Sequence, residues 1–178
     1  GTINLGANGA AYKSLIGMYA KAEAGKKAGV RNSGTINVNT KDSVGMYAEN
    51  GNADVDDVEL VNEKEINVNA ENSVGIFAKK AKVSKVGKIK LGDSADSSVA
   101  TYVSEGGTVN TDDADIDLGT KNQKRVAYYV NGAGSSLTGT KIGKISGYGV
   151  GVFLEGKSGS VATLNASTPE LNYTQDGN

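Results

Sequence analysis

One short motif recurs along the chain, and this recurrence limits the fold more than any other feature. The sequence SVGMYA at 43–48 returns as SVGIFA at 73–78, and LIGMYA at 15–20 has the same form. The copies are rich in β-branched and aromatic residues, which favours strands, and none carries a nucleophile, a base or a metal ligand. Repeated copies of one strand predict an architecture of stacked repeats rather than an active site.

Alignment of the copies divides the chain into six units. The first strands of the units begin at Ile3, Ile36, Ile66, Ile89, Ile116 and Ile145. The second strands, which are copies of the motif, span 16–20, 44–48, 74–78, 99–103, 126–130 and 150–154. Shorter apolar patches follow at Val55 and Val58, Val83 and Val86, Val109, Leu137, and Val161. Each unit therefore contains three short strands.

These units predict an all-β fold, a parallel β-helix (β-solenoid) of about six coils in which equivalent strands stack ~4.8 Å apart. A leucine-rich repeat fits poorly, because its spaced Leu and Asn positions are missing. The β-helix is expected over 1–165, followed at 166–178 by an irregular segment or the start of the next coil. AKAEAGKKAG at 20–29 is predicted to be a loop, with one or two helical turns as the alternative.

The composition excludes several kinds of chemistry. The chain has no Cys and no His, so disulfides, His acid–base catalysis and Cys/His zinc sites are excluded. Lys and Arg (19) balance Asp and Glu (20) and are scattered, so we predict no nucleic-acid partner. We also predict no cofactor. Because the chain begins with Gly1, we interpret it as a fragment of a larger protein, whose location a missing signal peptide does not indicate.

The acidic run TDDADIDLG at 111–119 is the strongest candidate for a metal site, because clustered carboxylates can bind Ca²⁺. Its spacing matches neither the EF-hand loop nor the glycine-rich nonapeptide repeat. In the stacked register, Asp115 lies between Lys88 and Lys144, so opposite charges alternate along the rod. We therefore predict a lysine-paired outer face and no metal site.

Enzymatic function is the first alternative, since many β-helices process acidic polysaccharides. Such sites need converging carboxylates, or Ca²⁺ with an Arg or Lys base. Here the only arginines, Arg31 and Arg125, lie in distant coils, and the carboxylates repeat rather than converge. We predict no catalytic residues. A polysaccharide-processing β-helix enzyme or a tailspike-like protein is kept as the alternative.

The best-preserved units resemble a known family. GTINVN at 34–39, DSVGMYAEN at 42–50 and NSVGIFAK at 72–79 are similar to the degenerate repeats in passenger domains of fusobacterial autotransporter adhesins, a type V secretion family. The resemblance is firm over 34–79, recognisable over 1–33 and degraded over 80–154. It implies a right-handed β-helix on the surface of a Gram-negative bacterium, exported across the outer membrane through a C-terminal barrel that these residues do not include.

The resemblance also implies a function in attachment. The partner would be a receptor on host or bacterial cells, either a protein or a glycan. A third reading is a pure spacer that holds a distal binding tip away from the cell. Because the end coils of a truncated rod leave open strand edges, end-to-end self-association is also expected.

The fifth position of the motif gives the only candidate binding residues. It is aromatic in every unit: Tyr19, Tyr47, Phe77, Tyr102, Tyr129 and Phe153. A small residue stands two positions earlier, at Gly17, Gly45, Gly75, Ala100, Ala127 and Gly151. We favour Val44, Met46 and Ala48 inside and the aromatics outside, because most of the aromatics carry a hydroxyl group. The aromatics would then form a ridge beside a strip of small residues. The alternative is an internal stack in which the small residues make room for the rings.

Overall fold

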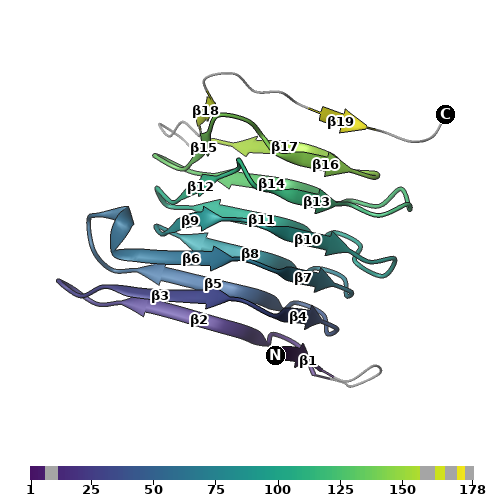
Figure 1. The fold of residues 1–178 in the computed structure, drawn as a ribbon, viewed down its shortest axis with the longest axis horizontal. Coiled ribbons are helices and arrows are strands. Elements are labelled where there is room, and N and C mark those ends of the chain that lie inside the picture. Colours follow the sequence, from purple (N-terminus) through teal and green to yellow (C-terminus); the bar gives the residue numbers. More distant parts are fainter. Residues whose placement is uncertain (7–11, 157–162, 167–171, 175–178) are drawn as a thin grey trace.

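The protein is a β-solenoid of three parallel sheets, with about five turns and three strands per turn (Figure 1). This computed structural model describes residues 1–6, 12–156, 163–166 and 172–174. Successive strands of one sheet belong to successive turns, so residues about one repeat apart in sequence lie side by side. The predicted parallel β-helix is confirmed.

The first sheet has seven strands and contains all six of the first strands predicted from the repeats. In spatial order they are β1 (Thr2–Leu5), β4 (Thr35–Val38), β7 (Glu65–Val68), β10 (Lys88–Leu91), β13 (Asp115–Asp117), β16 (Lys144–Ser146) and β19 (Asn172–Thr174). The six isoleucines that mark the repeats are in register across it. Strand β19 lies within 166–178 and pairs with β16 in parallel.

The second sheet contains the repeated motif. Its six strands are β2 (Ile16–Ala22), β5 (Val44–Asn50), β8 (Val74–Lys79), β11 (Val99–Ser104), β14 (Val126–Asn131) and β17 (Val150–Glu155). Each begins at the residue that the repeats indicated and runs one or two residues beyond the predicted end. The repeated motif is therefore one strand, copied once per turn.

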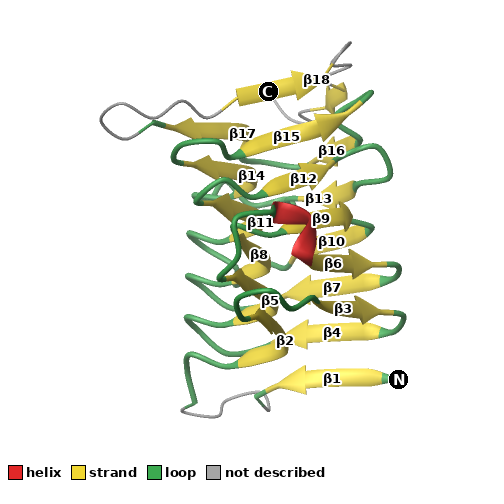
Figure 2. Ribbon diagram, turned by 90° about the vertical axis from the view of Figure 1, so that its left-hand side faces the viewer, coloured by secondary structure: helices red, strands yellow, loops and turns green. Residues whose placement is uncertain are grey.

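The third sheet closes each turn. Its strands are β3 (Ala28–Asn32), β6 (Val58–Asn62), β9 (Lys82–Lys85), β12 (Thr108–Asn110), β15 (Ser136–Gly139) and β18 (Thr163–Ala166). Val55 belongs to a short 3₁₀ helix, η1 (Val55–Asp57), that precedes β6 (Figure 2). Val161, predicted to mark the last of these strands, lies outside the described residues. Segment 20–29 contains no helix: β2 runs through Ala22, a turn follows, and β3 begins at Ala28.

The core fills the space between the three sheets. Its largest apolar members, all at most 1% exposed, are Ile36, Ile66, Ile89, Leu91 and Ile116 from the first sheet, Leu118 directly after it, Met46, Ile76 and Tyr128 from the second sheet, and Leu60 and Leu137 from the third. Each such side chain contributes about 1.5–3 kcal/mol by leaving water. Because equivalent positions stack from turn to turn, the core is a continuous column.

The corner before the second sheet is held by a ladder of serines. The backbone N–H of Ser43 donates to Ser73 Oγ at 3.2 Å, and that of Ser73 donates to Ser98 Oγ at 3.1 Å. The residue before each serine has a positive φ, at Asp42 (56°), Asn72 (53°) and Ser97 (52°). Asp and Asn tolerate this left-handed conformation better than most residues. The ladder sets where β5, β8 and β11 begin.

One buried hydroxyl group in the core lacks a hydrogen-bond partner among the described residues. Thr101 lies between Ile76 and Tyr128 in the inward column of the second sheet. Its Oγ1 is the one buried side-chain oxygen or nitrogen without a hydrogen-bond partner in the described part of the chain. We expect Thr101→Val to raise the free energy of unfolding by about 1 kcal/mol, because it removes this hydroxyl with little change of shape.

Urea denaturation would measure the effect, and Thr111→Val is the matched control. Thr111 is equally buried, but its Oγ1 donates to Thr138 O at 3.0 Å, so this variant should be less stable than the wild type. If both threonine variants lost stability, Thr101 would have a partner in solution.

Candidate functional site

The six aromatic residues of the motif form one column on the outer face of the second sheet. Neighbouring ring centroids are 4.6–5.3 Å apart along the whole column. Tyr19 and Phe153, at the two ends, are 48% and 42% exposed, whereas the rings between them are partly buried. Met46 and Ala48, on either side of Tyr47 in sequence, are fully buried. The predicted outward orientation of the aromatics is therefore confirmed.

The small residues do not lie beside this column, and that part of the prediction is wrong. Gly45 and Met46 are consecutive and both buried, so the in–out alternation of the strand breaks at this step. A Cβ at Gly45 would lie 2.7 Å from Gly75 O and 3.1 Å from Ile66 Cγ2, inside the core. The break also leaves Val44 only partly buried, although we expected it inside. Gly17, Gly45 and Gly75 thus make room for first-sheet isoleucines.

The rings cover one another to different extents. Tyr19 with Tyr47 and Tyr129 with Phe153 are nearly parallel, at 21° and 24°, whereas the three pairs between them are tilted by 34°, 39° and 68°. Rings this close and nearly parallel must overlap, so part of each face is hidden. A ligand on the column therefore meets mainly ring edges and hydroxyl groups. It meets an aromatic face only where neighbouring rings are tilted and leave part of that face uncovered.

Polar side chains flank the column at the position two residues after each ring. Tyr47 Oη donates to Glu49 Oε2 at 3.2 Å, and Tyr129 Oη donates to Glu155. Asn131 Nδ2 donates to Tyr102 Oη at 2.9 Å. These contacts fix the outer ends of the tyrosine rings.

The two carboxylates also change the acidity of the tyrosines. Burial, followed by the charge of Glu49, raises the pKa of Tyr47 from 10.0 to about 12. The hydrogen bond to Glu155, followed by burial, raises the pKa of Tyr129 from 10.0 to about 12. In both cases the neutral phenol is favoured in the folded state, because burial disfavours the phenolate and ionisation would place a second negative charge beside the carboxylate.

These shifts predict the behaviour at high pH. A folded-state pKa above the ordinary value means that the stability these groups contribute is complete below about pH 10 and is lost as the pH rises through about 12. In a tyrosinate absorbance titration, Tyr47 and Tyr129 should ionise only as the pH approaches about 12. Glu155→Gln should lower the midpoint of Tyr129 and leave that of Tyr47 unchanged. A single common midpoint near the ordinary value would contradict these assignments.

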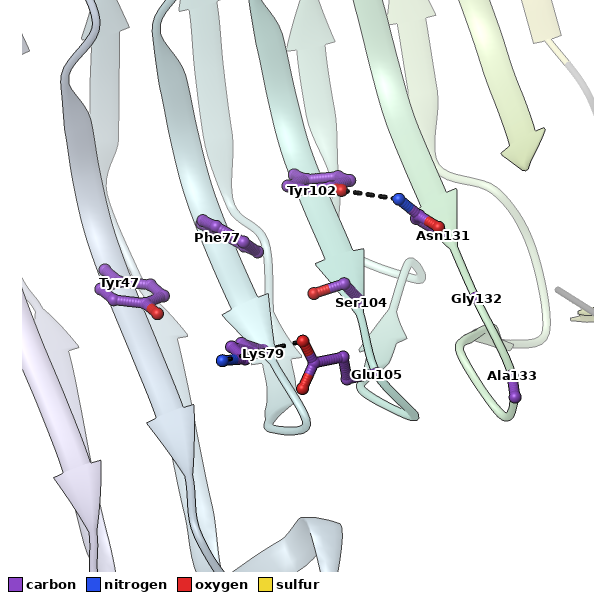
Figure 3. A pocket seen from close by; sticks show the side chains of 9 residues that line it. All are labelled: Tyr47, Phe77, Lys79, Tyr102, Ser104, Glu105, Asn131, Gly132 and Ala133. Carbon is purple, nitrogen blue, oxygen red and sulfur yellow. Dashed lines mark hydrogen bonds and ion pairs between the residues drawn. The ribbon is translucent and has the colours of Figure 1, made fainter. Parts of the chain in front are cut away.

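The column opens into a shallow groove of about 680 Å³ (Figure 3). Three rings, Tyr47, Phe77 and Tyr102, form one side of it. The others lining it are Lys79, Ser104, Glu105, Asn131, Gly132 and Ala133, from the ends of β8, β11 and β14 and the turns that follow. The Lys79 and Glu105 side chains approach to 3.7 Å. Aromatic and polar groups thus meet at one place on the column.

The sequence predicted the aromatic members of the groove but not the polar ones. Lys79, Ser104 and Asn131 occupy one strand position in successive turns, two residues after the ring, and this regular spacing could have identified them. Glu105 lies in a turn outside the repeated motif, so no pattern in the repeats indicates its place. Three other predicted binding residues, Tyr19, Tyr129 and Phe153, lie on the column but do not line the groove.

A second hollow, of about 500 Å³, lies between the first and third sheets and is lined mainly by charged side chains of both signs. Lys88 Nζ lies 3.1 Å from Glu65 Oε1, and Lys85 Nζ lies 3.9 Å from Asp113 Oδ2. Because these charges are paired with one another, the hollow offers no concentrated field for an ion.

The aspartates of the acidic run 111–119 make two kinds of contact, an ion pair and hydrogen bonds to backbone N–H groups. Asp115 Oδ1 pairs with Lys144 Nζ at 3.6 Å, as the stacked register predicted. Asp112 Oδ1 accepts hydrogen bonds from the backbone N–H groups of Thr140 and Lys141, and the bond from Thr140 lowers the pKa of Asp112. In the described residues, no group of three or more Asp or Glu side chains is arranged to hold a metal ion.

Comparison of the chain with protein-family models, with curated proteins and with solved structures gave no match. Within the described segments, no helix has the length and apolar character that crossing a membrane would require.

Proposed function

We propose that this chain is part of a non-catalytic rod on the outside of a Gram-negative cell, where it mediates attachment to bacterial or host cells. The observation that carries the proposal is the outward column of six aromatic residues, which continues along one sheet through every turn. An exposed row of apolar groups usually marks an interaction site. The resemblance of the repeats to autotransporter adhesins supports the cellular setting.

The distribution of charged groups supports the non-catalytic part of the proposal. Catalysis by carboxylates needs two acidic groups that converge on one substrate, with separated pKa values. In this chain acidic side chains such as Glu65 and Asp115 pair with lysines along the rod. This arrangement stabilises neighbouring turns and leaves the groove as the feature that could receive a partner.

A spacer function is the second candidate, and one observation favours it. Because neighbouring rings hide part of one another's faces, the column stabilises the stack even without a ligand, by about 0.5–1.5 kcal/mol per ring pair. A rod whose column served only this purpose would hold a distal binding site away from the cell. The two candidates differ in what happens when rings are removed.

The test is a binding assay with the protein coated on beads, against panels of bacterial and epithelial cells. We expect saturable binding, and we expect the double variant Tyr47→Ser/Tyr102→Ser to lose most of it while remaining folded. Met46→Ala is the matched control: it removes an inward side chain next to Tyr47, so it should lower stability and leave binding by the folded protein intact. Unchanged binding by the double tyrosine variant would exclude the column as the binding face and favour the spacer.

A further inference from the structure

The groove lies beside tilted rings in the middle of the aromatic column. Phe77 is tilted by 34° to Tyr47 and by 39° to Tyr102, more than the ring pairs at either end of the column. Tilted neighbours cannot cover each other's faces fully, so the space beside Phe77 gives access to part of an aromatic face. Phe77 also carries no hydroxyl, so this part of the groove is apolar.

Hydrogen-bonding groups surround this apolar area. Asn131 uses Nδ2 to donate to Tyr102 Oη, which leaves the Asn131 Oδ1 as an acceptor and the Tyr102 O–H as a donor. The Ser104 hydroxyl also lines the groove. The closest Lys79–Glu105 distance, 3.7 Å, is longer than a hydrogen bond, so both groups keep the capacity to bond a ligand.

The charges within the groove limit the class of ligand. Lys79 and Glu105 are opposite and adjacent, so a ligand carrying a net charge would gain from one and be repelled by the other. A purely apolar ligand would cover Lys79, Glu105 and Asn131 without replacing the hydrogen bonds that water gives them, which is costly. The groove therefore suits a neutral molecule with an apolar face and hydroxyl groups along its edge. Its volume falls within the usual range of small-molecule sites, about 300–1,000 Å³.

We infer that the groove binds a neutral hexopyranose residue of a glycan. The C–H face of the sugar would lie against Phe77, and its hydroxyl groups would bond Tyr102, Asn131 and the Lys79–Glu105 pair. This inference rests on the proposed function, because it identifies a glycan as the class of receptor and assigns its binding to the three rings of the column that line the groove.

The probes are the methyl glycosides of glucose, galactose, mannose and N-acetylglucosamine, titrated into the isotope-labelled chain and followed by NMR. At least one should cause saturable shifts at the amides of Lys79, Glu105 and Asn131 and none at Tyr19. Because these contacts include charged groups and an aromatic face, Lys79→Ala and Phe77→Leu should each weaken binding about tenfold or more.

Two matched controls occupy the same strand positions in other turns. Lys21 corresponds to Lys79, two turns away, and Phe153 corresponds to Phe77, three turns away. Neither lines the groove. Lys21→Ala and Phe153→Leu should therefore change the affinity less than about twofold, which is within the scatter expected for surface changes. Lys79→Ala keeps the test informative if Phe77→Leu fails to fold, because Lys79 is a half-exposed surface residue.

The inference is overturned if no glycoside shifts the groove amides, if the shifts map elsewhere, or if the control variants lose as much affinity as the groove variants. Cell binding separates this failure from failure of the proposed function. If no glycoside binds but Tyr47→Ser/Tyr102→Ser still abolishes cell attachment, the glycan site is wrong and the adhesive column stands. If a glycoside binds the groove but the chain attaches to no cell, the sugar site stands and the attachment function does not.

Discussion

Replacing Arg125 with alanine is expected to lower the free energy of unfolding by about 3–5 kcal/mol, although no carboxylate of the described residues forms an ion pair with this arginine. Arg125 is 1% exposed, and its guanidinium donates to backbone carbonyls at three places. Nε reaches Ala95 O at 3.2 Å, Nη2 reaches Gly92 O at 2.7 Å, and Nη1 donates to Leu118 O. The variant would leave these carbonyls unsatisfied around a cavity, which outweighs the benefit of removing a buried charge.

Two further variants separate the effect of the cavity from the effect of the lost hydrogen bonds. Arg125→Met fills most of the cavity but supplies no donors, so it should recover only part of the lost stability. Arg31→Ala is the control: Arg31 pairs with Glu63 at the surface, and its loss should cost less than about 1 kcal/mol. Urea denaturation measures all three. An Arg125→Met protein as stable as the wild type would mean that desolvation of the guanidinium, which lowers the pKa of Arg125, cancels its hydrogen bonds.

Gly75→Val is expected to destabilise the protein by about 3 kcal/mol or more, because its side chain would point into the core. A Cβ at Gly75 would lie 2.6 Å from Ala100 O and 3.1 Å from Ile89 Cγ2. Neither the backbone of the next turn nor the packed isoleucine can move away without disturbing the stack. The change would therefore push neighbouring turns apart.

The sign of this effect distinguishes the two orientations of the small residues. If they faced solvent beside the aromatic column, valine would be neutral or would stabilise the strand by up to about 1 kcal/mol. Gly29→Val is the matched control, because Gly29 is an exposed strand residue whose added Cβ would meet only Glu59 O, at 3.3 Å. Thermal unfolding of the two variants should therefore differ strongly. A Gly75→Val protein as stable as the Gly29→Val protein would contradict the inward placement.

The repeats predicted the fold because one physical pattern was copied many times. A stacked register requires that equivalent residues match in every turn, so six isoleucines at first-strand positions were enough to assign the first sheet and its pairing. The third strand of the first turn, β3, was missed because its sequence AGVRN contains one large apolar residue, Val30, and its pairing with β6 decides its conformation.

The wrong orientations predicted for Val44 and for the small residues both come from the assumption that strands alternate strictly. At Gly45 and Met46 two consecutive residues face inward, which reverses the parity between Val44 and Tyr47. The glycine is the signal for this break, since a Cβ at Gly45 would lie 2.7 Å from the backbone oxygen of Gly75 in the next turn. Strand propensity alone does not reveal which face that glycine occupies.

The buried arginine and the groove were harder to predict for a different reason. Arg125 precedes Val126 at the position that Ser43, Ser73 and Ser98 occupy in other turns, and this substitution was visible in the sequence. Its carbonyl partners, however, belong to turns of irregular length, whose conformation the repeats do not specify. The same holds for Glu105, which reaches the groove from a turn outside the motif.

The direction of the sheet hydrogen bonds has a mechanical consequence. In all three sheets these bonds join one turn to the next, so they lie along the length of the stack, as do the serine ladder and the Lys–Asp pairs. A pulling force along that axis passes through every interface between turns in series. Each interface then carries the full tension, and the weakest one yields first, by peeling rather than by collapse of the whole rod. A tether of this construction would lengthen stepwise under flow, one turn at a time, while the turns still stacked kept their shape.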